Sequence, residues 1–289
     1  MIVCNNQLTS EQLQAVEKLA LLCREVEGGA PPLYPHILEQ KRVTDNNFLY
    51  FHKKTLVGFL SSFFFYPTAC EVSLFVAPSY RRQGIATHLI KMAMPLFKAR
   101  QMEEVIFSAA AGVNDSWFTK LGFLYDNSEY QMERHGYEPI LLTKQVLVIK
   151  KATTKDISAL CLMDELCFAN AQDETVNRIS TILKDNGYTV FVAFHENQPV
   201  GKAHLRWQGN QVTLSDIAIL PQFQGQGWGS ELLAHCINHA LIHGKTRLIL
   251  DVETSNTHAL KLYTNYDFDI VNAIDYWKIN LAKLQSLLK

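Results

Sequence analysis

The chain has 289 residues, of which 48% are hydrophobic and 19% are charged, and its formal net charge at pH 7 is −1. This composition is typical of a folded globular protein and excludes a largely disordered chain. A net charge so close to zero gives no long-range attraction to nucleic acid or acidic lipid, so we expect neither nucleic acid nor a membrane as a partner. The length is sufficient for two domains of ordinary size.

The cysteine pattern and the N-terminal sequence both favour the cytoplasm. The six cysteines contain no C-x-x-C pair, which is typical of thiols in a reducing compartment. Charged residues bracket the apolar stretch 19–23, so a signal peptide is not expected, and no run approaches the length of a membrane span. These sequence criteria do not detect a specialised export signal.

The first half predicts strands and helices in alternation. In chain order we expect a strand at 2–4, a helix at 10–26, strands at 48–52, 56–65 and 72–76, a helix at 84–98, a strand at 105–108, a helix at 115–121 and a strand region ending at 134. The stretch 135–139 is the best linker candidate, so the domains are predicted at 1–138 and 139–289.

The second half repeats this order. We expect a strand at 146–150, helices at 155–167 and 174–184, strands at 189–194, 200–207 and 214–219, a helix ending near 243, a strand at 247–252, a helix at 256–263 and two last strands at 268–271 and 276–281. The fold class is therefore α/β of the α+β type, with two tandem domains. Each domain is expected to be a mixed, mainly antiparallel twisted sheet flanked by helices.

Two glycine-bearing turns occupy matching places in the two halves. The turn at 81–86 reads RRQGIA and the turn at 224–229 reads QGQGWG, and Gly84 and Gly227 are 143 residues apart, as are Pro78 and Pro221. A constant offset over a whole motif indicates duplication. A strand, a turn of small residues and a helix N-terminus together form a phosphate-binding arrangement, because backbone N–H groups converge there.

These turns resemble the Q/R-x-x-G-x-G/A signature of the GNAT superfamily, which comprises acyl-CoA-dependent N-acyltransferases. Gln224, Gly227 and Gly229 fill the signature in the second half, and Arg81, Gly84 and Ala86 fill it in the first. The second half also resembles the family's later element V-x-x-x-N-x-x-A-x-x-L-Y-x-x-x-G-F. Its matching residues are Val252, Asn256, Ala259, Leu262, Tyr263 and Phe268, while Asp267 stands where the family has glycine.

Among tandem members, the layout looks most like the VipF group of bacterial effectors, which are delivered into host cells, and mycothiol-synthase-type enzymes share the tandem plan. The resemblance implies acetyl-CoA as cosubstrate, an amine acceptor that is a protein, and secretion into a host cell by a specialised system. It also implies two sets of coenzyme-binding residues. The second-half set is Ile217, Ala218, Ile219, Gln224, Gly225, Gln226, Gly227, Trp228, Gly229, Ser230 and Asn256, and the first-half set is Phe75, Val76, Arg81, Arg82, Gln83, Gly84, Ile85, Ala86 and Thr87.

Tyr263 is the predicted general acid. A phenol with an ordinary pKa of about 10 stays protonated at neutral pH and can protonate a departing thiolate. The alternative is a core tyrosine on an amphipathic helix, and Asn256 is expected to cap that helix. The general base is predicted to be Asp216 or, second, Glu253, with a water chain as the alternative. In the first half Phe118 aligns with Tyr263 and has no proton to donate, so we expect a weak or silent module.

Two further patterns receive a structural interpretation. His235, His239 and His243 recur every fourth residue with Glu231 nearby, but we expect a solvated helix flank and no metal site. The aromatic run 63–66 is expected in the core, with an acceptor groove or an interface as the alternative.

The sequence therefore predicts an acetyl-CoA-dependent N-acetyltransferase that acts on a primary amine of a protein lysine or N-terminus, with catalysis in the second half. Two alternatives stay open: a small-molecule amine acetyltransferase, and a non-catalytic acyl-CoA-binding protein.

Overall fold

The computed structural model describes residues 1–142, 144–168 and 172–288, and it divides the chain into two compact units. Unit 1 comprises Met1–Tyr130, Glu253–Ser255 and Asn272–Lys289, and unit 2 comprises Gln131–Val252 and Asn256–Val271. The units therefore do not coincide with the sequence repeat 1–138 and 139–289, because the C-terminal residues from Asn272 onward belong to unit 1.

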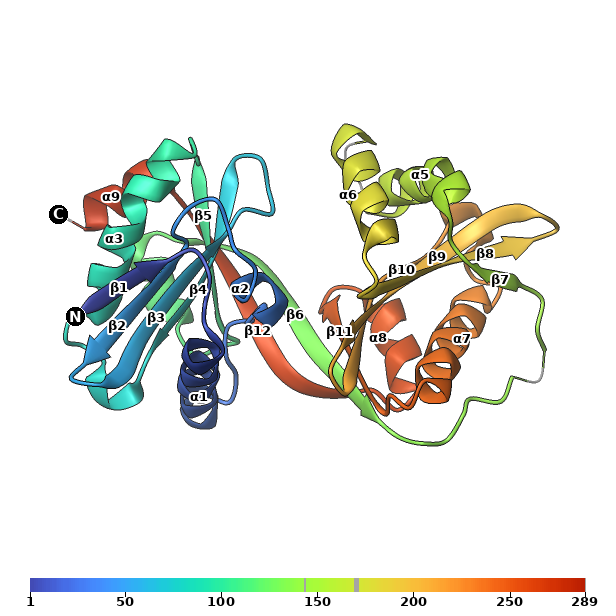
Figure 1. The fold of residues 1–289 in the computed structure, drawn as a ribbon, viewed down its shortest axis with the longest axis horizontal. Helices are drawn as coiled ribbons and strands as arrows, with labels where there is room; N and C mark the ends of the chain where they lie inside the picture. The colour runs from blue at the N-terminus through green and yellow to red at the C-terminus, as the bar shows by residue number, and fades with distance from the viewer. Residues whose placement is uncertain (143, 169–171, 289) are drawn as a thin grey trace. The chain divides into compact units, whose positions relative to one another are not determined.

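The sheet of unit 1 contains the strand order β1-β2-β3-β4-β5-β12-β6 (Figure 1). These strands are β1 (Ile2–Asn5), β2 (Asn47–His52), β3 (Thr55–Phe63), β4 (Ala69–Val76), β5 (Glu104–Ala110), the first part of β6 (Leu124–His135) and the main part of β12 (Asp269–Asn280). β4 and β5 are parallel, whereas β12 runs antiparallel to β5 with Tyr276 opposite Ser108.

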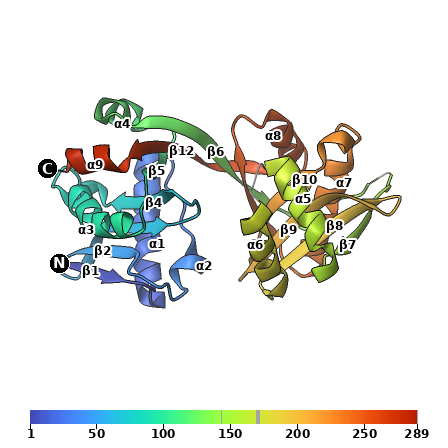
Figure 2. The ribbon, with the colours of Figure 1, turned by 90° about the horizontal axis from the view of Figure 1, so that it is seen from above.

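Helices cover both faces of the central strand β3, which buries every residue from Leu56 to Phe63. The helices of unit 1 are α1 (Ser10–Glu27), α2 (Pro35–Leu38), α3 (Ile85–Ala99), α4 (Asp115–Leu121) and α9 (Leu281–Leu287). α1 begins at a capping box formed by Thr9 and Gln12. α9 follows directly on β12 and lies beside α3 (Figures 1 and 2), where Leu284 joins the core.

Unit 2 has the order β6-β11-β10-β9-β8-β7, with only the last part of β6 included. Its other strands are β7 (Val148–Lys151), β8 (Tyr188–His195), β9 (Gln198–Gln208), β10 (Gln211–Ile219) and β11 (Arg247–Glu253, of which Glu253 is grouped with unit 1). Its helices are α5 (Ile157–Phe168), α6 (Gln172–Lys184), α7 (Trp228–Ile242) and α8 (Thr257–Thr264).

The predicted fold class is confirmed: each unit is a mixed sheet flanked by helices, in which the parallel pairs β4–β5 and β10–β11 stand beside antiparallel pairs. Two details were wrong. The two last strands predicted at 268–271 and 276–281 are the single strand β12. Asn272 does not start a turn, because its side chain forms hydrogen bonds with the backbone N–H and carbonyl of Ala30. Residues 281–287 form α9, which begins where the Asn280 side chain accepts the N–H of Ala282.

The segment between β6 and β7 has no regular secondary structure at residues 136–142 and 144–147. It is nevertheless fixed to α7, because Asn238 exchanges two hydrogen bonds with the backbone of Ile140 and the Glu231 carboxylate accepts the N–H groups of Val146 and Leu147. Within the described residues, no helix is both long enough and apolar enough to cross a membrane.

Candidate active site

In unit 2, β10 and β11 separate part-way along their length. Their parallel pairing covers only Gln211 to Thr213 of β10, although β10 continues to Ile219. Beyond Thr213 the backbone of β10 therefore no longer has a β11 partner on that side. Such an opened strand edge can accept hydrogen bonds from, or donate them to, an extended ligand.

The glycine turn of unit 2 connects the end of β10 to α7. A short 3₁₀ turn at Pro221–Phe223 precedes Gln224, whose side-chain amide donates to the carbonyl of Ile219 over 2.9 Å. Gly225 and Gly227 both have φ near +80°, a conformation that side chains other than glycine rarely adopt, and a Cβ at either position would point into open space. α7 begins immediately after Gly227.

This turn presents a row of unused hydrogen-bond donors, which we call the unit 2 cradle (residues 225–229). Among the described residues, none of its five backbone N–H groups has a hydrogen-bond acceptor, and the first bonds of the helix are those from Ser230 and Glu231 to Gly227. Free N–H groups at a helix N-terminus attract an anion, because the helix dipole adds to their partial charge. The unit 2 cradle therefore fits a phosphate group.

A β-bulge interrupts β10 just before the turn. Ser215 pairs with His204 and Ala218 pairs with Lys202, so two residues of β10, Asp216 and Ile217, lie opposite the single residue Ala203. Asp216 has φ of +51°, an uncommon value for a residue other than glycine. A bulge leaves backbone groups unpaired and redirects side chains.

Charged side chains surround the bulge. The Lys202 ammonium and the Asp164 carboxylate, both fully buried, form an ion pair; Arg178 lies 2.9 Å from Asp164 and 3.4 Å from Asp216. Nδ1 of the buried His204 lies 3.3 Å from Asp216, while its Nε2 has no hydrogen-bond partner among the described residues. We call these five residues the charge cluster. Burial acts to raise the pKa of Asp216, but His204, Lys202 and Arg178 together hold that pKa well below its ordinary value.

Tyr263 lies on α8 with 8% of its surface exposed. Burial, with a smaller contribution from Cys236, raises the pKa of Tyr263 to about 12, so its hydroxyl stays protonated at neutral pH. The Asn256 side chain accepts the N–H of Ala259 and caps α8, and the N–H of Phe268 returns to the Tyr263 carbonyl. These contacts fix both ends of the short helix that carries the phenol.

Comparison with known proteins agrees with this geometry. The model of the Acetyltransferase (GNAT) family matches residues 13–123 and again residues 158–268. The chain belongs to the GNAT acetyltransferase family. Both of its halves are GNAT domains, and it is an acyltransferase.

Curated relatives match only part of this GNAT protein. The [Ribosomal protein bS18]-alanine N-acetyltransferase of Haemophilus ducreyi is 40% identical over 60 residues, which are 21% of this chain and 41% of the relative. The enzyme of the same name from Escherichia coli is 38% identical over 60 residues, which are 21% of this chain and 40% of the relative. The chain thus matches about two fifths of the length of these relatives.

Solved structures share the fold over nearly the whole chain. A GCN5-related N-acetyltransferase from Sphaerobacter thermophilus aligns with a TM-score of 0.80 at 14% identity, over 97% of this chain and 96% of that one. A tandem GNAT protein from the clavulanic acid biosynthesis pathway aligns with a TM-score of 0.69 at 15% identity, over 97% and 99%. At these identities the likeness concerns the fold.

The first GNAT domain has the same turn in unit 1. Gly84 has φ 79° and ψ 4°, against 81° and 1° for Gly227, and the guanidinium of Arg81 donates to the Val76 carbonyl as Gln224 does to Ile219. Among the described residues, the backbone N–H groups from Arg82 to Thr87, which we call the unit 1 cradle, have no acceptor. Arg82 holds φ +61° where unit 2 has Gly225.

Unit 1 differs from unit 2 in the strand that precedes the turn. β4 pairs with β3 without interruption from Glu71 to Val76, so it has no bulge. Segment 29–32 is also fixed at the point where β4 and β5 separate: the Ser73 hydroxyl donates to the Pro32 carbonyl over 2.6 Å, and Asn272 bonds both backbone groups of Ala30.

Phe118 occupies the position of Tyr263, as predicted from the alignment of Phe123 with Phe268. In both units the N–H of the later phenylalanine donates to the carbonyl of the residue five positions earlier, at 3.0 Å from Phe123 to Phe118 and 3.1 Å from Phe268 to Tyr263. The Phe118 ring stacks on Trp277 at 5.3 Å between ring centroids. A side chain without a proton to donate therefore stands in the place of the phenol.

Two of the three predicted catalytic residues belong to the same unit. Asp216 and Tyr263 both belong to unit 2, whereas Glu253 is grouped with unit 1, is exposed, and accepts the Ser255 hydroxyl. The sequence analysis missed the charged residues around Asp216. Lys202 and His204 could have been noticed, because they interrupt the otherwise apolar run 200–205.

The histidine stripe on α7 has a packing role. His235 and His239 make edge contacts with Phe191, and His239 and His243 contact Trp207. Burial lowers the pKa of His239 to about 4, with further lowering by His243 and His235. Among the described residues, no group of three metal-binding side chains comes together.

Proposed function

We propose that the chain transfers an acetyl group from acetyl-CoA to a primary amine, and that unit 2 carries out the reaction. This proposal rests on three features that occur together in unit 2: the free N–H groups of the cradle, the bulged edge of β10 and the buried, protonated Tyr263. Unit 1 has the cradle but neither the bulge nor the phenol. We therefore propose that unit 1 binds coenzyme through Arg81 to Thr87 without efficient turnover.

Each feature of unit 2 has a task in acyl transfer. The cradle N–H groups bind the pyrophosphate of the coenzyme, and the backbone of Ile217 to Ile219 binds its amide-bearing arm as a neighbouring strand would. The bulge presents a backbone N–H to the thioester oxygen, where negative charge develops during attack. Tyr263 donates its phenolic proton to the thiolate as the carbon–sulfur bond breaks, so that the coenzyme leaves as a thiol, and the phenolate regains a proton from water.

Proton removal from the attacking amine needs a separate acceptor. A carboxylate whose pKa is far below its ordinary value is a weak base, so the ion pairs of Asp216 weaken its predicted role as a direct base. We propose that Asp216 instead fixes the bulge through the charge cluster and that water removes the amine proton. Glu253, the second predicted base, stays a prediction.

The proposed acceptor is an amine of a protein, at an N-terminus or a lysine. The names of the curated relatives, which give an alanine of a ribosomal protein, support a protein acceptor over the matched fifth of this chain. A small-molecule amine is the second candidate. Delivery into a host cell as an effector, which the VipF-like layout suggests, and residence in the cytoplasm stay predictions.

Thiol release from acetyl-CoA by the full chain tests the proposal with three acceptors: a peptide with a free N-terminal alanine, an N-terminally blocked peptide with one lysine, and a small diamine. We expect turnover with a peptide, and mass spectrometry should find one added acetyl group on its amine. Faster turnover of the diamine than of either peptide would indicate that the acceptor is a small-molecule amine. Coenzyme binding without turnover of any acceptor would instead favour the binding protein.

A further inference from the structure

Residues 29–34, which connect α1 to α2 and which we call the strap, lie where β4 and β5 of unit 1 separate. β4 pairs with β5 only from Ala69 to Val72, although β4 continues to Val76 and β5 continues to Ala110. Unit 1 therefore has an opening between these strands, as unit 2 has between β10 and β11. In unit 2 the proposed function assigns such an opening to the arm of the coenzyme.

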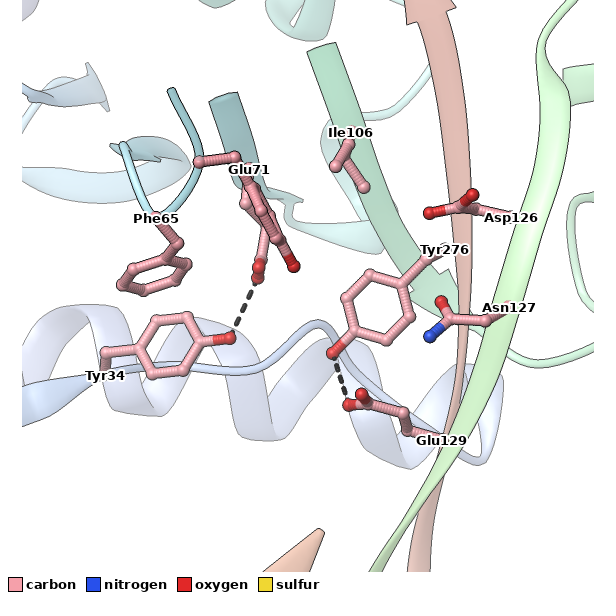
Figure 3. A pocket seen from close by; sticks show the side chains of 9 residues that line it. Tyr34, Phe65, Glu71, Ile106, Asp126, Asn127, Glu129 and Tyr276 are labelled. Atoms are coloured by element: carbon pink, nitrogen blue, oxygen red, sulfur yellow. Dashed lines mark hydrogen bonds between the residues drawn. The ribbon is translucent and has the colours of Figure 1, made fainter. Parts of the chain in front are cut away.

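The strap is bonded to β4 on one side of the opening. The hydroxyl of Ser73, a fully buried residue just beyond the last pair with β5, donates to the Pro32 carbonyl over 2.6 Å. Two residues earlier on the same face of β4, the Glu71 carboxylate accepts the Tyr34 hydroxyl over 2.9 Å (Figure 3). Two side chains of one strand therefore hold the second half of the strap.

Aromatic contacts fix the end of the strap. The Tyr34 ring meets the rings of Phe63 and Phe65 edge to face, at 4.7 Å and 5.2 Å between centroids. Phe63 is buried whereas Phe65 is 46% exposed, so the run 63–66 enters the core only at its start. These rings hold Tyr34 in the orientation in which its hydroxyl reaches β4.

The strap is bonded to β12 on the other side of the opening, beyond the end of β5. Asn272 accepts the N–H of Ala30 over 3.1 Å and donates to its carbonyl over 2.9 Å. A Cβ added at Gly29 would lie 3.0 Å from the Ala273 carbonyl oxygen and 3.1 Å from the Cβ of Ala110, so glycine permits this close approach. Because β5 lies between β4 and β12 in the sheet, the strap spans the opening from one wall to the other.

The sequence of the strap makes it stiff. Proline fixes φ at about −65° and also restricts the residue before it, so Pro31 and Pro32 limit the backbone of Ala30 as well. Pro31 is buried, as is Ala30. A stiff, buried segment that is bonded at both ends stays in place and does not act as a mobile lid.

Aromatic side chains cover the opposite face of the sheet beside the opening. The Phe118 ring of α4 stacks on Trp277 of β12. The neighbouring Tyr276 lines the same cavity as Glu71 and Tyr34, on the face that carries the strap (Figure 3). Because side chains of a strand alternate between the faces, Trp277 and Phe118 lie on the other face.

We propose that the strap closes the opening of unit 1 to amines, so that acetyl-CoA bound at the unit 1 cradle is shielded from acyl transfer. This rests on the coenzyme binding that the proposed function assigns to unit 1. An arm that pairs with β4 as a strand has its carbonyl groups near the plane of the sheet, and a nucleophile attacks an acyl carbon from above or below that plane. In unit 1 the strap covers one of these directions, and Phe118 on Trp277 covers the other.

Shielding differs from the mere loss of a catalytic side chain. Without a general acid, enzymatic transfer is slow, but a bound thioester stays open to a strong nucleophile that needs no catalyst. A strap that covers the acyl carbon also blocks this attack. The reactivity of bound acetyl-CoA toward such a nucleophile therefore distinguishes the two causes of silence in unit 1.

Hydroxylamine tests the proposal, because its nitrogen attacks the acetyl carbon of a thioester without a catalyst and the coenzyme leaves as a thiol. The full chain with Gly227→Glu retains only the unit 1 cradle for acetyl-CoA, and chromatography of acetyl-CoA and CoA measures the reaction. With the protein at about ten times its Kd, about nine tenths of the acetyl-CoA is bound, so we expect its consumption to be about tenfold slower than that of free acetyl-CoA.

Two variants in the same background release the strap. Ser73→Ala/Asn272→Ala removes its bonds to both walls, and Pro31→Gly/Pro32→Gly removes its stiffness. Each should bind acetyl-CoA with a Kd within about threefold of the parent and lose most of the protection. Ser116→Ala, at an exposed serine of the same unit, is the matched control and should protect as the parent does.

Thermal unfolding verifies that each variant is folded, and either release variant carries the test if the other is not. Two results would overturn the proposal: bound and free acetyl-CoA react at the same rate, or the folded release variants protect as well as the parent. If Gly227→Glu binds no acetyl-CoA, the shield is refuted together with the coenzyme binding proposed for unit 1. Absence of turnover in Gly84→Glu, with protection by unit 1 as expected, would count against the proposed function alone.

Discussion

The two units share a phosphate cradle but not the chemistry beside it. Gly84 and Gly227 agree within a few degrees in φ and ψ, and each turn is tied to its strand by a side chain that donates to a strand-end carbonyl. Unit 2 adds a bulge in β10 and Tyr263, where unit 1 has an uninterrupted β4 and Phe118. A cradle made of backbone groups is thus preserved with the single shared glycine Gly84 or Gly227, whereas catalysis depends on particular side chains.

The same contrast extends to the buried face beside the bulge. Lys202 pairs with Ala218 in unit 2 as Phe59 pairs with Phe75 in unit 1, and both Lys202 and Phe59 are fully buried. Unit 2 therefore maintains a buried cation where unit 1 has an aromatic core residue. A buried ion pair gives little net stability compared with apolar residues, although the loss of one partner is costly. We therefore attribute the charge cluster to the function of the site.

The largest expected effect comes from the phenol. Tyr263→Phe should lower kcat by about 10²- to 10⁴-fold, the usual range for losing a general acid, while the Kd for acetyl-CoA stays unchanged. Thiol-release kinetics and calorimetry measure the two quantities. The reciprocal Phe118→Tyr variant is the matched control and should give no new activity, because unit 1 also lacks the bulge. Wild-type kcat in Tyr263→Phe would show that another group protonates the thiolate.

Breaking the charge cluster should destabilise unit 2. Lys202→Met leaves Asp164 with Arg178 alone, and removing one partner of a buried ion pair costs about 3 to 5 kcal/mol. The double variant with Asp164→Leu should recover most of this loss. Phe59→Met, at the equivalent position of unit 1, should cost less than about 1.5 kcal/mol. Urea unfolding measures all three. A small loss in Lys202→Met would mean that the pair is not buried in solution.

The buried carboxylates of the two units should respond to pH in opposite ways. The pKa of Glu71 is raised from 4.5 to about 7, so folding favours its protonated form and the stability of unit 1 falls as the pH rises through this interval. A shift of this size corresponds to roughly 3 kcal/mol at most. The pKa of Asp216 is lowered, so its contribution to unit 2 is present above about pH 4 and is lost as the pH falls below that value.

Hydrogen exchange resolved by unit measures both pH dependences. Glu71→Gln should abolish the loss in unit 1, and Asp216→Asn should abolish the loss in unit 2. If both wild-type units instead lost stability in the same direction between about pH 4 and about pH 7, the environments derived for the two carboxylates would be wrong.

The smallest expected effect concerns the turn itself. Arg82 holds a positive φ that unit 2 assigns to Gly225, so Arg82→Gly should stabilise unit 1 by roughly 0.5 to 1 kcal/mol. Gly225→Arg should destabilise unit 2 by a similar amount. Denaturant unfolding of both variants measures the difference, and an Arg82→Gly variant that is less stable than wild type would point to a role for the Arg82 side chain.

The sequence predicted the two-domain fold and the turns because their signals are local. Glycines at fixed offsets, capping residues and apolar periodicity do not depend on distant contacts. The last strand was harder to predict, because the polar Asn272 resembles a strand break in the sequence. Its hydrogen bonds to Ala30, 242 residues away, show why β12 continues.

The spacing of the two repeats does not reveal the bulge in β10, although the family resemblance implies one. Six residues separate the paired residues Arg206 and Thr213 across the β9–β10 turn, whereas seven separate Phe63 and Glu71 across the β3–β4 turn. The extra residue of the bulge compensates this difference. Equivalent residues of the two units are therefore 143 positions apart both before the turn and after the bulge. The charge cluster was hidden because Asp164, Arg178 and Asp216 come from three separate elements.

The central claim is that both units have a coenzyme cradle and that only unit 2 catalyses. Coenzyme binding and turnover measured together in Gly227→Glu and Gly84→Glu test it most directly, since each variant adds a negative charge at a residue of the cradle that holds a positive φ and caps the following helix. We predict that Gly227→Glu abolishes turnover and one binding event, while Gly84→Glu loses the other binding event and keeps its turnover. Turnover that survives in Gly227→Glu, or that disappears in Gly84→Glu alone, would contradict the account.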